Sequence, residues 1–445
     1  MKNILLIGAG RSTISLIEYL LENLEREDWS LIVADQNLDF ASSKIGNNKR
    51  AKAIQFDVTN DSQRETEIKK ADIVISMLPA HMHISVAKDC ISNKKNMVTA
   101  SYVSKEMRAL EPEAIKNGVT IINEIGVDPG IDHLSAMKVI DEIREAGGEI
   151  EEFETFTGGL VAPESDDNPW NYKFTWNPRN VVLAGQGGAV KFIQSGTYKY
   201  IPYHKLFRRT EIIEVDGFGK FEGYANRDSL AYREVYDLEN VKTMYRGTLR
   251  RPGFSRAWNV FVQLGATDDS YTIPNSDDLT FRDFINLFLA YNPTDSVELK
   301  LRHYLDMHQD DVALFEKLEW LDIFEPIKIP LKNASPAQIL QYILERKWSL
   351  KKDDKDMIVM WHKFIYELNG EQKELHSSMV VKGEDSMRTA MAKTVGYPVA
   401  IAAKMILKGK INTPGVHIPI SKEIYTPVLQ ELKKYGVVFS EKQIR

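Results

Sequence analysis

Short apolar runs alternate with amphipathic segments through the first 125 residues of the chain. Runs of strand character cover residues 4–7, 30–34, 52–56, 72–76, 96–100 and 120–123. Between the first two, Ile14, Ile17, Leu20, Leu21 and Leu24 recur at helical spacing, which predicts a helix with one apolar face. Strands that alternate with helices predict an α/β domain with a doubly wound parallel sheet, whose ligands bind at the carboxyl ends of the strands.

The first strand runs into a turn with two glycines, in the sequence KNILLIGAGRST of residues 2–13. Without side chains at Gly8 and Gly10, backbone N–H groups and a helix beginning at Arg11 can approach a pyrophosphate. We therefore expect a dinucleotide site, although Thr13 replaces the third glycine of the usual fingerprint. A turn that serves only tight packing is the alternative. The residues expected at the cofactor are Gly8, Gly10, Arg11, Ser12, Thr13, Asp35, Asp57, Val58, Leu78 and Pro79.

Asp35 follows the second strand, close to where the fingerprint expects an acidic residue. A carboxylate there accepts hydrogen bonds from ribose hydroxyls and repels a 2′-phosphate. No arginine follows in Gln36 and Asn37. The sequence therefore favours NAD as the cofactor, with NADP as the alternative.

The character of the chain changes at about residue 150, where β-rich segments with glycine, proline and aromatic residues begin. Charged helical segments cover 281–350, strand character returns at 357–368 and 374–382, and a helix rich in alanine is expected from about residue 386. We predict a Rossmann-type domain over 1–127, completed by 386–445. A mixed α/β substrate domain is predicted over 128–280 and 351–385, and a small helical subdomain over 281–350.

Composition indicates an ordinary folded protein, with 43% hydrophobic and 27% charged residues. The chain has 57 Lys and Arg and 63 Asp and Glu, which gives a net charge of -6. It therefore has no overall basic field that would attract nucleic acid or an anionic membrane. Cys90 is the only cysteine, which excludes an internal disulfide and fits a reducing compartment. No secretory signal or membrane-spanning run is apparent, so a cytoplasmic location is expected.

Two clusters of polar residues carry candidate chemistry. In EIGVDPGIDH, residues 124–133, Asp128 either contacts a substrate or caps a helix that has Pro129 at its first position. The nearby Asp132 and His133 do not amount to a metal site, and no metal is expected. Arg227 in NRDS and Arg246, Arg250 and Arg251 in RGTLRR could bind carboxylates in a bidentate manner. The alternative for each arginine is a solvated surface position.

Seven motifs in order along the chain resemble the saccharopine dehydrogenases of the glutamate-forming type, also called saccharopine reductases. The motifs are NMVTASYVS (96–104), NEIGVDPGIDH (123–133), GGLVAPESDDNPWNYKFTW (158–176), YANRDS (224–229), RGTLR (246–250), KDMIVM (355–360) and AMAKTVGYPVAIAAKMIL (390–407). The resemblance extends from the first strand to SKEIYTPVL near the C-terminus. It covers essentially the whole chain.

This resemblance implies a reversible oxidation of saccharopine with NAD or NADP, followed by hydrolysis of the imine to glutamate and 2-aminoadipate 6-semialdehyde. It further implies a homodimer that acts in lysine metabolism. By similarity, the substrate site is lined by Ser101, Tyr102, Asp128, Arg227, Thr248, Leu249 and Arg250. Asp128 and Tyr102 are the candidates for proton transfer.

The chain departs from the pattern of its relatives at two places. Thr157 stands where relatives often have cysteine, and Arg11 and Ser12 stand where they tend to have an aromatic or small residue followed by valine. The rival reading is a carboxynorspermidine or homospermidine synthase, but a diamine site should present carboxylates instead of arginines. A non-catalytic nucleotide-sensing protein of the same fold is the second alternative.

Overall fold

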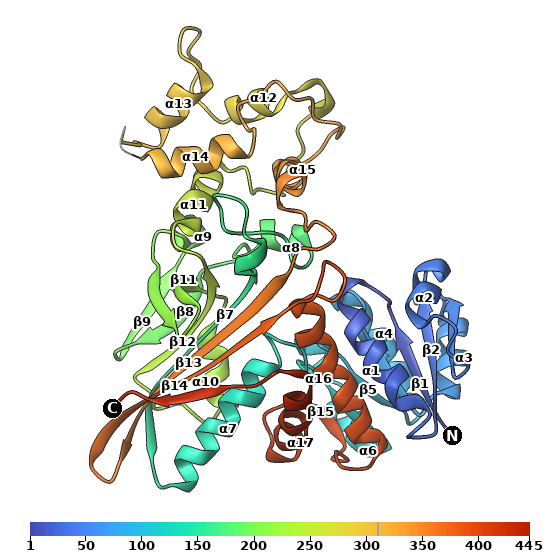
Figure 1. Ribbon diagram of the computed structural model, residues 1–445. Coiled ribbons are helices and arrows are strands. Elements are labelled where there is room, and N and C mark those ends of the chain that lie inside the picture. Colours follow the sequence, from blue (N-terminus) through green and yellow to red (C-terminus); the bar gives the residue numbers. More distant parts are fainter. Residues whose placement is uncertain (309–310) are drawn as a thin grey trace. The chain divides into compact units, whose positions relative to one another are not determined.

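A computed structural model describes residues 1–308 and 311–445; residues 309–310, within the predicted helical subdomain, lie outside the described residues. The chain divides into two compact units (Figure 1). Unit 1 comprises Met1–Ile150 and Ile365–Arg445, and unit 2 comprises Glu151–Phe364. The three-domain division expected from the sequence stays a prediction.

Unit 1 is built on a seven-stranded parallel sheet with the strand order β15-β6-β5-β4-β1-β2-β3. Its strands are β1 (Lys2–Ile7), β2 (Trp29–Asp35), β3 (Ala51–Gln55), β4 (Ile73–Ser76), β5 (Asn96–Val98), β6 (Thr120–Ile122) and β15 (Gly415–His417). The strand order reverses between β1 and β4, which is where doubly wound sheets bind their ligands. The predicted sheet is thus confirmed, and the C-terminal β15 extends it.

Helices connect these strands and continue into the C-terminal part of unit 1. They are α1 (Ile14–Leu24), α2 (Leu38–Ile45), α3 (Asp61–Lys70), α4 (His83–Ser92), α5 (Lys105–Arg108), α6 (Glu111–Asn117), α7 (Ile131–Glu145), α16 (Ala390–Leu407) and α17 (Lys422–Leu432). Unit 1 also holds β14 (Glu371–Lys382), which pairs antiparallel with β16 (Ser440–Gln443).

Two predicted helix starts are wrong by a few residues. Residues Arg11–Thr13 form a 3-10 turn before α1, because the Thr13 N–H and hydroxyl both donate to the Gly10 carbonyl. The helix expected from about residue 386 begins at Ala390 instead. Asp385 accepts hydrogen bonds from the Met387 and Arg388 N–H groups in a turn, and Thr389 then caps the helix through the Ala392 N–H.

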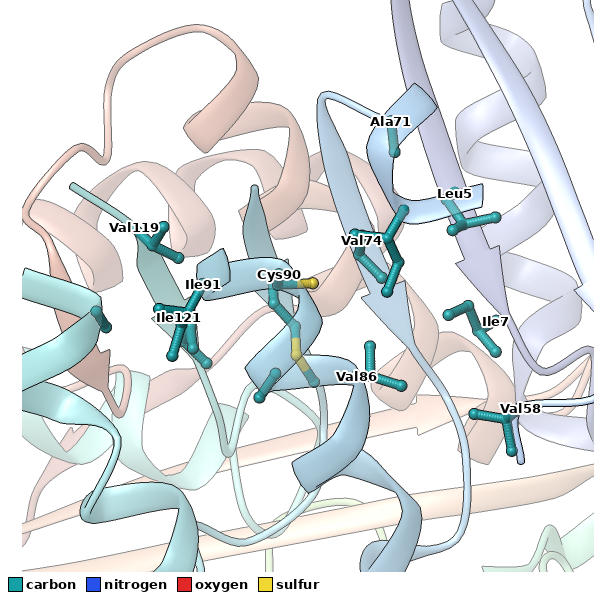
Figure 2. Close-up of a cluster of buried hydrophobic side chains, with 14 of the residues drawn as sticks. Leu5, Ile7, Val58, Ala71, Val74, Val86, Cys90, Ile91, Val119 and Ile121 are labelled. Atoms are coloured by element: carbon teal, nitrogen blue, oxygen red, sulfur yellow. The ribbon is translucent and has the colours of Figure 1, made fainter. Parts of the chain in front are cut away.

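One face of the sheet carries an apolar core that α4 covers. Figure 2 shows Val86, Cys90 and Ile91 of α4 beside Val74 of β4 and Ile121 of β6. All five side chains are at most 1% exposed. Burial raises the pKa of the Cys90 thiol, which therefore stays protonated as part of this core.

On α16, small residues allow close contact with α1. A Cβ added at Gly396 would lie 2.7 Å from the Leu16 backbone nitrogen, so the two helices approach nearly backbone to backbone. By length and composition α16 is the one described helix that could cross a membrane, but 83% of its 18-residue window is buried inside the protein. The apolar character of α16 is accounted for by its position in the core of unit 1.

Unit 2 contains a mixed sheet in which β10-β11-β12-β7-β13 lie in that order, with β8 beside β12 and β9 beside β8. The strands are β7 (Glu149–Val161), β8 (Val190–Gln194), β9 (Thr197–Ile201), β10 (Glu211–Val215), β11 (Gly219–Ala225), β12 (Thr243–Arg250) and β13 (Asp356–Leu368). Glycines make room for one large ring in this sheet. A Cβ at Gly223 or Gly247 would lie within 2.6 Å of the Phe156 ring.

The described helices of unit 2 are α8 (Pro178–Val182), α9 (Tyr203–Leu206), α10 (Tyr232–Val235), α11 (Phe254–Leu264), α12 (Phe281–Asn286), α13 (Val297–Tyr304), α14 (Val312–Trp320) and α15 (Pro336–Trp348). The last four confirm the helical character predicted for the described residues of 281–350.

Candidate active site

The glycine turn after β1 lies at the switch point of the unit 1 sheet. Gly8 has a φ of +96°, and a Cβ on it would meet the Met77 carbonyl oxygen after β4 at 2.7 Å. Gly8 is therefore required by the fold. Gly10 differs, because its φ of -59° suits any residue and no atom lies within 4 Å of an added Cβ. The exposed surface of Gly10 is open space that a pyrophosphate could enter.

A buried lysine that the sequence reasoning missed holds this turn from α2. Lys44 is 8% exposed, and its Nζ donates to the Ala9 carbonyl at 2.6 Å, to the Gly10 carbonyl and to Thr13 Oγ1 at 3.1 Å. Burial lowers the pKa of Lys44 to about 8, while Asp35 acts in the opposite direction. Ala41, Lys44 and Ile45 are the buried residues of α2. A lysine on the apolar stripe of a helix was the sequence signal available for it.

Asp35, at the end of β2, binds the same turn. Its Oδ2 accepts a hydrogen bond from the Ala9 N–H at 2.7 Å and its Oδ1 accepts one from the Asn37 N–H at 2.8 Å. Each carboxylate oxygen can accept a further hydrogen bond. The half-buried Asp35 thus presents negative charge beside the glycine turn.

The remaining residues predicted at the cofactor follow the same edge of the sheet. Arg11 and Asp57 are exposed, and Thr59 holds the Asp57 carboxylate through its N–H and hydroxyl, which lowers the pKa of Asp57. Val58 is buried, and its carbonyl accepts a hydrogen bond from Arg64. Of the others, Ser12 and Leu78 are half-buried and Pro79 is exposed.

Ser101 and Tyr102 follow β5 and are both half-buried. The Ser101 hydroxyl lies 2.7 Å from Nε2 of His83, the first residue of α4, and the other ring nitrogen lies 2.8 Å from Ser76 Oγ. Sequence reasoning missed His83, because no spacing rule relates a residue at a helix start to a serine on the next strand.

Asp128 lies in a loop between β6 and α7 whose other acidic residues serve the fold. Buried Glu124 accepts a hydrogen bond from the Val103 N–H and lies 2.9 Å from Nε2 of buried His133. Asp132 accepts one from the Gly130 N–H at 2.6 Å.

The alternative reading of Asp128 as a helix cap is wrong. The helix α7 begins at Ile131 with Gly130 at the N-cap position, so Asp128 and Pro129 both lie outside it. The Asp128–Pro129 peptide bond is cis, and the Asp128 side chain is half-buried. Asp128 is therefore not the N-cap residue of α7.

In unit 2, Arg250 lies at the end of β12 among aromatic rings. Its guanidinium carbon lies 4.9 Å from the ring centroid of Tyr172 and 5.3 Å from that of Phe254. Arg250 is 6% exposed, and its Nη1 donates to the Leu249 carbonyl, whereas Nε has no hydrogen-bond partner in the described part of the chain.

The hydroxyl of Tyr172, whose ring lies against Arg250, likewise lacks a hydrogen-bond partner among the described residues. Burial raises the pKa of Tyr172 to about 12, so the phenol remains a donor at neutral pH. A buried cation and a buried hydroxyl that both have unused N–H or O–H groups form a site suited to an anion.

The NRDS and RGTLR motifs lie together in unit 2. The Asn226 N–H donates to the Arg246 carbonyl, and the Arg246 N–H donates to Ser229 Oγ. Arg227 is exposed with a φ of +51°. The half-buried Thr248 pairs with Thr157 of β7.

The other two residues predicted from RGTLRR have roles in the fold. The Leu249 side chain is fully buried at 0% exposure. Its backbone carbonyl accepts the hydrogen bond from Arg250 Nη1. Arg251 donates to the Phe218 carbonyl at 2.8 Å and covers the Phe221 ring. Because its guanidinium is engaged in this way, Arg251 is the weaker candidate for binding a carboxylate.

Comparison with known protein families gives two matches that together cover nearly the whole chain. Residues 4–122 match the saccharopine dehydrogenase NADP binding domain, and residues 126–437 match the saccharopine dehydrogenase C-terminal domain.

The relatives with similar sequences include proteins of the same name and a longer protein with another name. The chain is 36% identical over 452 residues to saccharopine dehydrogenase [NADP(+), L-glutamate-forming] of Saccharomyces cerevisiae, covering 100% of this chain and 99% of that protein. It is 33% identical over 459 residues to the mitochondrial alpha-aminoadipic semialdehyde synthase of Bos taurus, covering 99% of this chain but 47% of that longer protein. The solved structure of apo saccharopine dehydrogenase (L-Glu forming) from Saccharomyces cerevisiae matches with a TM-score of 0.90 and 35% identity over 100% of both chains.

Proposed function

The chain belongs to the saccharopine dehydrogenase family, and on that premise we propose that it interconverts saccharopine and water with L-glutamate and L-2-aminoadipate 6-semialdehyde in lysine metabolism. A nicotinamide dinucleotide held at the glycine turn of Gly8 and Gly10 would supply the acceptor for the hydride that leaves the carbon that becomes the aldehyde. Water then adds to the imine carbon, and glutamate leaves with the nitrogen.

The observation that carries the substrate assignment is the anion site at Arg250. We propose that the Arg250 guanidinium binds one carboxylate of saccharopine, because it is a cation whose Nε–H lacks a partner in the described chain. Saccharopine has three carboxylates, and Arg227 and the Thr248 hydroxyl are the further groups proposed to bind them. A diamine substrate would leave the buried guanidinium without a counter-charge, which disfavours the spermidine synthase alternatives.

Asp128 and Tyr102 are the groups proposed to move protons. The secondary amine must be neutral before the hydride leaves, and water must lose a proton as it adds to the imine. A half-buried carboxylate and a phenol after β5 can serve as the base and its hydrogen-bonding partner. The capping role that would otherwise explain Asp128 does not apply, since α7 starts at Ile131.

The glycine turn fits a nicotinamide dinucleotide. Gly10 leaves open space over the turn, and the backbone N–H groups that follow it belong to the 3-10 turn leading into α1. The family model and the fungal relatives are named for NADP and favour that cofactor. In this chain, however, the negative charge of Asp35 lies beside the turn and would repel the 2′-phosphate of NADP, which supports NAD.

One assay tests the activity. Purified protein is mixed with saccharopine and either NAD or NADP, the absorbance of the reduced nicotinamide is followed, and the products are identified. We expect glutamate and the semialdehyde in equal amounts, and no signal with norspermidine- or homospermidine-type substrates. Absence of signal with both cofactors would overturn the proposed function.

The cofactor preference is tested by the same assay at Asp35. We expect wild type to have the higher kcat/KM with NAD, and Asp35→Ala to shift the ratio toward NADP because the charge facing a 2′-phosphate is removed. A wild type that prefers NADP would show that Asp35 does not set the choice.

Location and assembly complete the proposal. A cytoplasmic enzyme is supported by the single, fully buried cysteine and by the burial of the one described helix long enough to cross a membrane. A homodimer is proposed from the family resemblance, and sedimentation analysis of the purified protein tests it.

A further inference from the structure

A buried imidazole joins two serine hydroxyls behind the carboxyl ends of β4 and β5. His83 Nδ1 lies 2.8 Å from Ser76 Oγ, and His83 Nε2 lies 2.7 Å from Ser101 Oγ. His83 is 3% exposed and Ser76 is 0% exposed, whereas Ser101 is half-buried. The contacts therefore lead from the interior of unit 1 to one of the residues proposed to line the substrate site.

The backbone of Ser101 is held in place on both sides. Its N–H donates to Thr99 Oγ1 at 3.2 Å, and its carbonyl accepts a hydrogen bond from the Glu124 N–H at 3.0 Å. The side-chain hydroxyl is free to rotate about its own bonds unless a partner fixes it. In this structure that partner is His83 Nε2.

The state of the imidazole determines what it can offer Ser101. Burial lowers the pKa of His83 to about 4 and His81 adds to the effect, while a hydrogen bond to the Leu78 backbone opposes it. A neutral imidazole has one N–H donor and one acceptor nitrogen. Its two serine partners are therefore bonded with opposite polarity, and Ser101 Oγ is held beside Nε2.

We propose that His83 is a positioning residue, which fixes Ser101 Oγ through Nε2 so that this oxygen can contact the substrate. The inference rests on the proposed function, because Ser101 is assigned to the substrate by family resemblance. His83 itself need not touch the substrate. Its effect should appear in turnover with saccharopine.

Two amide substitutions separate this role from a purely structural one. The glutamine side-chain amide reaches the place of Nε2 and can still contact Ser101, whereas the shorter asparagine amide reaches the place of Nδ1 and can contact only Ser76. We expect His83→Asn to lower kcat with saccharopine about tenfold and His83→Gln to stay within about threefold of wild type. The dissociation constant of the reduced cofactor, measured by nicotinamide fluorescence, should be the same in the two variants, because both remove the imidazole that bonds the Leu78 backbone.

Ser101→Ala gives a test that does not depend on the folding of the His83 variants. We expect it to lower kcat as much as His83→Asn does, and the double variant to lose no more than Ser101→Ala alone. The proposal would be overturned if Ser101→Ala kept the kcat of wild type, or if the losses of kcat in the two single variants added up in the double variant. It would also be overturned if His83→Asn were as active as His83→Gln. A wild type inactive with saccharopine and both cofactors would instead overturn the proposed function.

Discussion

Asp128 is the half-buried carboxylate of a loop whose other acidic residues serve the fold. Glu124 lies against His133, and Asp132 accepts the Gly130 N–H. We expect Asp128→Ala to lower turnover more than tenfold, since general acid–base help contributes about a hundredfold or more. Cofactor affinity, measured by fluorescence titration, should remain unchanged. Turnover like that of wild type would leave Asp128 without a part in the proton transfers.

Arg250 and Arg251 are adjacent arginines with opposite environments, which makes them a matched pair. Arg250 Nε lacks a hydrogen-bond partner in the described chain, while Arg251 donates to the Phe218 carbonyl. We expect Arg250→Met to raise KM for saccharopine roughly 10- to 100-fold, the value of a hydrogen bond to a charged group. Arg251→Met should leave KM near that of wild type. Equal effects of the two substitutions in steady-state kinetics would contradict a carboxylate site at Arg250.

The buried His83 should make the stability of the protein depend on pH. An unfolded chain protonates this imidazole near its ordinary pKa of 6.5, whereas the folded protein does so only at about 4. Between these values the unfolded state binds more protons, so stability falls as the pH is lowered through this window. From pH 7.5 to 5 the contribution lost is about 2 kcal/mol. Urea titrations at the two pH values measure this loss. Between pH 7.5 and 5, the free energy of unfolding of His83→Gln should fall by about 2 kcal/mol less than that of wild type. Equal losses in the two proteins would contradict a lowered pKa of His83.

At the scale of the element, the two glycines of the turn after β1 have different roles. Gly8 is needed for the fold, and Gly10 is proposed to leave space for the cofactor. Gly8→Ala should destabilise the protein by roughly 1–3 kcal/mol, because the residue has a positive φ and an added Cβ meets the Met77 carbonyl. Gly10→Ala should change the free energy of unfolding by less than about 0.5 kcal/mol, since nothing in the protein contacts the new Cβ. Its cofactor affinity should nevertheless fall at least about tenfold, because the methyl group enters the space left for the pyrophosphate. Undiminished affinity in Gly10→Ala would favour a turn that serves packing alone.

Helices and strands could be predicted from the sequence where their positions depend on the local pattern of apolar residues. Strand and helix periodicity located β1, α1 and β2, and the alternation gave the doubly wound sheet. Helix starts were less accurate, because hydrogen bonds within single turns decide them, such as the Thr13 hydroxyl on the Gly10 carbonyl. The side chains that support the site, Lys44 and His83, were not found, since their partners lie on other elements that only the folded chain brings near.

For the whole molecule, the notable feature is that unit 1 is made from two distant segments of the sequence. These segments meet inside unit 1, where a Cβ on Gly148 would lie 3.3 Å from the Glu367 carbonyl oxygen. The second segment supplies β15, which pairs with β6, and α16, which packs on α1 through Gly396. Unit 2 is thus an insertion into a unit that contains every residue proposed to bind the cofactor.

This arrangement predicts that cofactor binding and turnover can be separated. A protein in which residues 1–150 are joined to 365–445 by a short glycine–serine linker should fold and bind the reduced cofactor, because the seven-stranded sheet and its covering helices are retained. It should not turn over saccharopine, since Arg250 and Tyr172 belong to unit 2. Residues 1–150 alone should fail to bind, because loss of α16 and β15 uncovers the apolar face of α1 and the edge of β6. Circular dichroism and nicotinamide fluorescence measure both outcomes, and a joined protein that folds without binding would show that the cofactor site needs unit 2.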